Sequence, residues 1–108
     1  MMNPRRVHEL MTAHFPQVEL VTLNWLNVLE ADGTIRKKVL DRLIDEFIHA
    51  DEILVEVNRK LGDLKPRSQV ISYVQEHVGK GQMRIAGRDF HGYVLIGMNG
   101  VAAGWSSP

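Results

Sequence analysis

The side chains that could do chemistry form two groups, and the first lies near the C-terminal end. His91 and Tyr93 stand two positions apart, and Arg84 and Arg88 precede them. A guanidinium binds anions and an imidazole titrates near neutral pH, so this combination could hold an anion or move a proton. These four residues are therefore our candidates for ligand or partner binding.

The second group is acidic and lies in the middle of the chain. Asp45 and Glu46 fall four and three positions before His49, one helical turn away, which is the spacing at which carboxylate and imidazole can share a metal ion. The complementary half of such a site is missing, so a solvated helix face is the favoured interpretation. Ser68 and Ser72 lack the turn that exposes a nucleophile, and the chain has no cysteine. We expect no metal site, no cofactor and no catalytic residue.

Charges of opposite sign are separated along the chain, although the formal net charge is zero. Residues 41–56 hold six acidic side chains and one basic one, whereas residues 59–88 hold seven basic and two acidic ones. Such a pattern is typical of an anion-binding face, of opposite patches that pair between two copies, or of faces that are simply solvated. The solvated interpretation carries the most weight.

The basic half also suggests binding to nucleic acid. A helix, a turn at Gly62, a second helix and a hairpin resemble in outline a helix-turn-helix with a wing. Lys65, Arg67 and Lys80 would contact phosphates, and Gln69 would point outward from the second helix. The neutral overall charge and the acidic preceding helix argue against this alternative.

A hydrophobic stripe at helical spacing predicts a helix over residues 35–48. Beyond Ala50 the stripe continues with heptad spacing through Leu54, Val57 and Leu61, which are our candidates for an oligomer seam. Three alternatives stay open: one helix to Leu61, a break near Ala50, or a strand over residues 53–57. A seam longer than a small core needs favours a homodimer.

Glycines at the C-terminal end predict a three-stranded antiparallel meander. Asn99-Gly100 is the dipeptide that a two-residue hairpin prefers, because both residues need positive φ. That turn would pair Val94 with Trp105. We therefore expect one core layer built from these two residues together with Ile96, Val101, Leu43 and Phe47.

The remaining signals are helical. Asn3-Pro4 predicts the start of a first helix, Lys65-Pro66 opens a later one, and residues 18–29 favour helix over strand. The expected fold is α+β: about four N-terminal helices followed by a C-terminal three-stranded antiparallel β-meander, in a single domain over residues 1–108. The start lacks the apolar core of a signal peptide and no apolar run could span a membrane.

These observations favour a small cytoplasmic, non-enzymatic binding or regulatory protein of a bacterium or phage. We expect it to act through protein–protein contacts, with a homodimer as the expected assembly. A nucleic-acid-binding regulator is the alternative. A small enzyme or ligand-binding domain with its site at Arg84, His91 and Tyr93 is the third interpretation.

Overall fold

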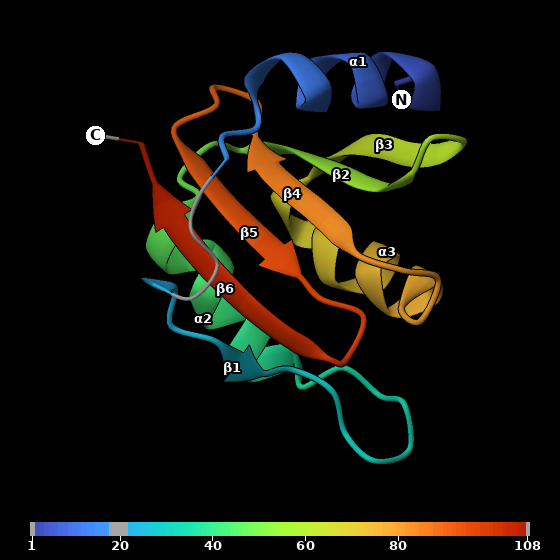
Figure 1. The fold of residues 1–108 in the computed structure, drawn as a ribbon, viewed down its shortest axis with the longest axis vertical. Coiled ribbons are helices and arrows are strands. Elements are labelled where there is room, and N and C mark those ends of the chain that lie inside the picture. Colours follow the sequence, from blue (N-terminus) through green and yellow to red (C-terminus); the bar gives the residue numbers. More distant parts are fainter. Residues whose placement is uncertain (1, 18–21, 108) are drawn as a thin grey trace.

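A six-stranded antiparallel sheet forms the centre of the protein (Figure 1), in a computed structural model that describes residues 2–17 and 22–107. The strands lie in the order β1-β6-β5-β4-β2-β3, and every neighbouring pair is antiparallel. The elements in chain order are α1 (Pro4–His14), β1 (Leu26–Asn27), α2 (Lys37–Phe47), β2 (Glu52–Asn58), β3 (Leu61–Pro66), the 3-10 turn η2 (Arg67–Gln69), α3 (Val70–His77), β4 (Met83–Gly87), β5 (Gly92–Ile96) and β6 (Val101–Ser106).

The mixed α+β composition agrees with the sequence, but the predicted arrangement of about four helices before a three-stranded meander is wrong. The described residues form three α-helices and six strands, and strands occur on both sides of α2 in the chain. The error lies mainly in residues 52–66, which form a β-hairpin. Of the three alternatives left open there, the strand over residues 53–57 is confirmed by β2, and the continuous helix to Leu61 is wrong.

The hairpin of β2 and β3 replaces the heptad helix because β2 is buried on both faces. Leu54 faces α1, while Val55 and Val57 face the helices on the other side of the sheet. A strand covered on both faces loses the alternation that identifies a strand, and its apolar run then matches other periods. Gly62 ends no helix: it lies in β3, where a Cβ atom would come within 2.9 Å of the Val55 carbonyl oxygen.

The first core lies between the sheet and the helices α2 and α3, which cover the same face in Figure 1. The predicted helix over residues 35–48 is confirmed for Lys37–Phe47, and Leu43 and Ile44 point into this core. From α3, Val70 and Val74 join the same cluster, in the region where the sequence predicts a helix after Lys65-Pro66.

Two strand glycines let α2 approach the sheet. A Cβ atom on Gly92 would lie 1.6 Å from the carbonyl oxygen of Phe47, and one on Gly104 would lie 2.3 Å from the Phe47 ring. Glycine at these two positions is therefore required by the close contact with the end of α2.

The β5–β6 hairpin exists, but its register is shifted by one residue from the predicted one. The loop between the two strands is four residues long, Gly97–Gly100, and the Gly97 N–H donates to the Val101 carbonyl oxygen. Of the pair Asn99-Gly100, only Gly100 has a positive φ. Val94 therefore pairs with Gly104, and Trp105 pairs with Tyr93. A shift of one residue reverses the faces of a strand, so the predicted single core layer is wrong for Val101 and Trp105.

The second core lies under α1 on the opposite face of the sheet. Asn3 caps this helix as predicted, accepting a 2.8 Å hydrogen bond from the Arg5 N–H. Its buried side chains Val7, Leu10 and Met11 pack on the sheet beside Leu54, Ala86 and Tyr93. Because α1 lies against β2 and β3, the part of this face formed by β4, β5 and β6 extends beyond the helix.

The segment after α1 differs from the favoured helix over residues 18–29. Residues 18–21 lie outside the described part of the chain, and the described remainder contains β1, which pairs with β6 through Leu26–Ala102 and Asn27–Val101. Among the described helices, none has the length and apolar content needed to cross a bilayer.

Candidate functional site

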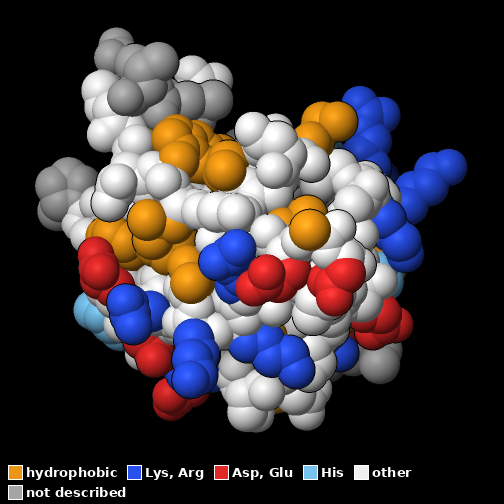
Figure 2. Space-filling model, turned by 90° about the horizontal axis from the view of Figure 1, so that it is seen from below, with side chains coloured by type: hydrophobic (Ala, Val, Ile, Leu, Met, Phe, Trp, Pro, Cys, Tyr) orange, Lys and Arg blue, Asp and Glu red, His pale blue; other side chains and the backbone are white. Residues whose placement is uncertain are grey.

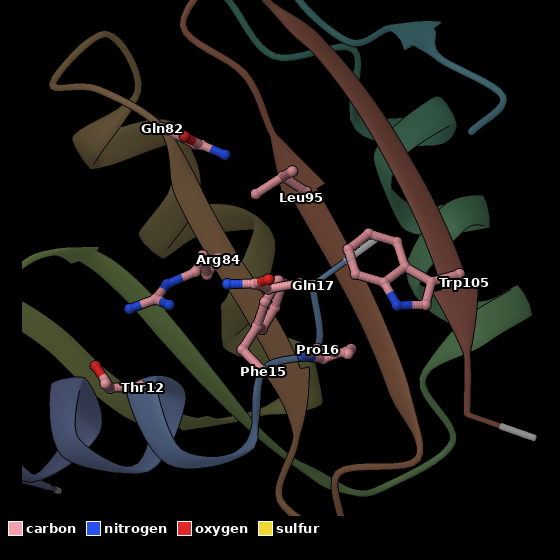
Figure 3. A pocket seen from close by; sticks show the side chains of 8 residues that line it. All are labelled: Thr12, Phe15, Pro16, Gln17, Gln82, Arg84, Leu95 and Trp105. Atoms are coloured by element: carbon pink, nitrogen blue, oxygen red, sulfur yellow. The ribbon is translucent and has the colours of Figure 1, made fainter. Parts of the chain in front are cut away.

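Beyond α1, the sheet carries two adjoining hollows that we call the β5 trough. One measures about 660 Å³ and the other about 580 Å³, and they share Gln82 and the side chain of Leu95. The first is lined by Thr12, Phe15, Pro16, Gln17, Gln82, Arg84, Leu95 and Trp105, and the second by Trp25, Gln82, Leu95, Gly97, Met98, Asn99 and Val101. Figure 3 shows Leu95 between Arg84 on one side and Trp105 on the other.

Arg84 forms one wall of the trough and is held by a buried carboxylate. It lies directly across from Glu56 on the neighbouring strand β2. Its Nε donates to Glu56 Oε1 at 2.5 Å, and a terminal nitrogen forms an ion pair with the same oxygen. The Arg84 side chain is 28% exposed and that of Glu56 is 6% exposed, so the end of the pair that faces the trough and solvent is cationic.

His8 completes this cluster from the other side. Its Nδ1 forms a hydrogen bond with Glu56 Oε2, which joins helix α1 to the sheet. Each oxygen of the buried carboxylate therefore has a partner, as a charge in a protein interior requires. Arg84 also lies over the Phe15 ring, 5.6 Å from its centroid, so a second contact fixes the guanidinium.

The opposite wall is aromatic. Trp105 stacks on Tyr93 with ring centroids 5.7 Å apart and meets Phe15 edge-on at 5.5 Å. Within the described residues the buried Nε1 of Trp105 has no hydrogen-bond partner. Packing alone therefore holds this wall in place.

The far end of the trough is apolar and open. Met98, at the tip of the β5–β6 loop, is 80% exposed. Figure 2 views the molecule from this end and shows hydrophobic side chains gathered toward one edge, with mostly charged and polar side chains over the rest. Large apolar side chains left in solvent beside a hollow are typical of an interaction surface.

The four predicted binding residues are not brought together as one site. Arg84 lines the trough, whereas Tyr93 is buried beneath it, where its hydroxyl donates to the Phe90 carbonyl at 2.6 Å. Arg88 and His91 are exposed in the turn between β4 and β5. At Gly104, on the neighbouring strand β6, the position that a side chain would take is filled by Phe47 of α2.

Several of the residues proposed for nucleic-acid contact are already paired within the protein, and the element directly before Gly62 is the strand β2 and not a helix. Arg67 donates to Asp45 at 3.0 Å and to the carbonyls of Ile48 and Ala50. Its role is therefore to close the connection after α2.

Lys65 pairs with Asp63 at 3.5 Å and lies over the Tyr73 ring, and Lys80 contacts His77 Nδ1 at 3.0 Å. Gln69 is exposed at the end of η2. Burial raises the pKa of Tyr73, and the negative charges of Asp63 and Glu76 add to this effect.

The three seam candidates lie in the core. Leu54 is fully buried under α1, while Val57 is buried on the α2 and α3 side and Leu61 packs against the same cluster. They form no common surface, because β2 sends Leu54 and Val57 to opposite faces of the sheet.

Asp63 holds the N-terminal segment in place. Its Oδ1 accepts the backbone N–H of Met2 at 2.7 Å and that of Leu64 at 2.8 Å. Burial alone raises the pKa of this carboxyl, but the two N–H donors and the Lys65 ammonium outweigh it, so the pKa lies below the ordinary value of 3.8. Across the described residues, no group of three or more His, Asp or Glu side chains is placed to hold a metal ion.

Sequence reasoning missed Glu56, the partner of Arg84, and His8, the second partner of Glu56. Glu56 was counted in an acidic run and His8 drew no attention. A signal for Glu56 does exist, since it stands between Val55 and Val57 in an apolar run, and a charge in such a position needs a partner. Comparison with known protein families, with characterised proteins and with solved structures finds no match to this chain.

Proposed function

We propose that this protein is a non-enzymatic binding module that takes a segment of a partner protein into the β5 trough. The observation that carries this proposal is the stretch of sheet beyond α1, hollowed along Leu95 and bordered by the exposed Met98. Burying such apolar surface releases about 25 cal/mol for each Å² removed from water.

The shape of the trough favours a polypeptide over a small molecule. Small-molecule sites enclose most of their ligand, whereas both hollows here are open to solvent along one side. An extended segment that lies over the open face of β5 would direct alternate side chains toward Leu95 at the floor of the trough.

Contacts within the protein make the nucleic-acid alternative less favourable. Arg67 and Arg84, two of the cations in the basic half, pair with Asp45 and Glu56 of the acidic half. The charge separation in the sequence is thus cancelled in part between neighbouring elements, and fewer cations remain for phosphates.

The test is a selection of random 12-residue peptides displayed on phage against the full-length protein. Affinities of selected peptides are then compared for two variants, Met98→Gln/Val101→Gln in the trough and Val39→Gln on α2, where a valine of similar burial lies on the other side of the molecule. We expect Val101→Gln combined with Met98→Gln to weaken binding at least ten-fold, and Val39→Gln to leave it unchanged.

Two results would overturn the proposal: a selection that yields no binding peptide, or peptides that bind the trough variant as tightly as the wild type. A second copy of the chain is also a partner protein. A dimer in light scattering that dissociates in the Met98→Gln/Val101→Gln variant would identify that copy as the occupant and support binding through the trough.

A further inference from the structure

We infer that the segment bound in the β5 trough carries an Asp or Glu side chain that pairs with Arg84, with apolar residues toward Met98. This inference rests on the proposed function and adds the chemistry of the partner. The inference follows from the position of Arg84, which is the one charged side chain among the described residues that line the trough.

Arg84 has donors left after its contacts with Glu56. The pair uses Nε and one terminal nitrogen, and the other terminal nitrogen has no partner among the described residues. A guanidinium presents five N–H donors in a fixed plane, so it can bind a second carboxylate while Glu56 keeps its orientation.

The surroundings favour a carboxylate over a neutral acceptor. Glu56 lies behind Arg84, away from solvent, and the remaining polar side chains of this hollow, those of Thr12, Gln17 and Gln82, are uncharged. No acidic side chain in the described lining competes for the guanidinium. A hydrogen bond to a charged group contributes more than one between neutral groups, which makes Arg84 the specificity-determining residue of the trough.

The geometry indicates a side chain and not a chain end. Arg84 stands on the side wall, across Leu95 from Trp105, while Met98 and Val101 continue the trough past it. The backbone of a segment that runs along β5 passes beside Arg84, so the segment meets the guanidinium with a side chain and not with its C-terminal carboxylate.

The experiment uses three pools of synthetic nine-residue peptides and the immobilised full-length protein. All pools vary among Leu, Val, Ile, Phe, Ser and Thr at the flanking positions. The first pool has a central Glu and the second a central Gln, both with acetylated and amidated ends, and the third has a central Gln with a free C-terminal carboxylate. Retention is measured by mass spectrometry on the wild type and on three variants. These are Arg84→Gln/Glu56→Gln, the trough variant Met98→Gln/Val101→Gln, and Arg88→Gln as the control at an exposed arginine.

We expect the Glu pool to be retained about ten-fold more strongly than the Gln pool on the wild type and on Arg88→Gln. On Arg84→Gln/Glu56→Gln this preference should vanish while retention of the Gln pool is unchanged. The double variant removes both charges together, so no buried carboxylate is left unpaired. A thermal unfolding curve of this variant checks that it is folded.

Equal retention of the Glu and Gln pools would overturn the carboxylate inference and leave the proposed function standing. A preference that persists without Arg84 would also overturn it, as would a preference shown only by the pool with a free C-terminus. If no pool is retained more strongly on the wild type than on Met98→Gln/Val101→Gln, the proposed function fails as well.

Discussion

Arg84 of β4 lies directly opposite Glu56 of β2, and the buried Glu56 carboxylate holds the more exposed Arg84 guanidinium in place. His8 of α1 binds the other oxygen of the Glu56 carboxylate. The pair therefore connects helix α1 with Arg84 in the wall of the trough. The same three residues thus fix α1 on the sheet and orient the cation that the trough presents.

Removing one partner of this pair should cost more stability than removing both. Arg84→Gln leaves Glu56 buried with only His8, and an uncompensated buried charge costs about 3 kcal/mol. In Arg84→Gln/Glu56→Gln the two amides replace both charges, so we expect a smaller loss. Urea unfolding of both variants measures the difference, and a double variant less stable than Arg84→Gln would refute the assignment.

The contact of Phe47 with Gly104 should appear as strong coupling. Gly104→Ala places a methyl group against the Phe47 ring and should cost about 1–3 kcal/mol through overpacking. In a Phe47→Ala background the clash is absent, so the same change should cost much less. A double-mutant cycle of unfolding free energies gives the coupling, and additive effects would contradict this packing.

Asp63 should stabilise the protein in a pH-dependent way. Its pKa is lower in the folded state than the ordinary value of 3.8, so its contribution is fully present above that value and is lost as the pH falls through the folded-state pKa. We expect Asp63→Asn to be less stable than the wild type by about 1–2 kcal/mol at neutral pH. The difference should shrink below pH 3.8, and a gap that widens on acidification would show the opposite shift.

The sequence predicts the elements whose hydrophobic period is unambiguous. The stripe from Val39 to Phe47 repeats at helical spacing, and the structure has α2 there. The Asn99-Gly100 dipeptide correctly predicts a hairpin, but it does not determine the loop length. Gly97 extends the loop to four residues, and this moves Trp105 from the predicted core to the trough.

The β2–β3 hairpin could not be read from periodicity because β2 is covered on both faces. Leu54 and Val57 fit heptad positions by coincidence, although they point to opposite sides of the sheet. The candidate site was foreseen only at Arg84. Its partner Glu56 lies 28 positions away in the sequence, and His8, which binds the other oxygen of the same carboxylate, lies 76 positions away. Only folding brings the three residues together.

The most direct measurement of the central claim is a heteronuclear NMR titration of the full-length protein with the most strongly retained Glu-centred peptide. Binding in the β5 trough predicts amide shifts centred on Gln82, Arg84, Leu95 and Val101, with little change along α2 and α3. Shifts centred on α2, α3 or the outer strand β3, with none around Leu95, would contradict it.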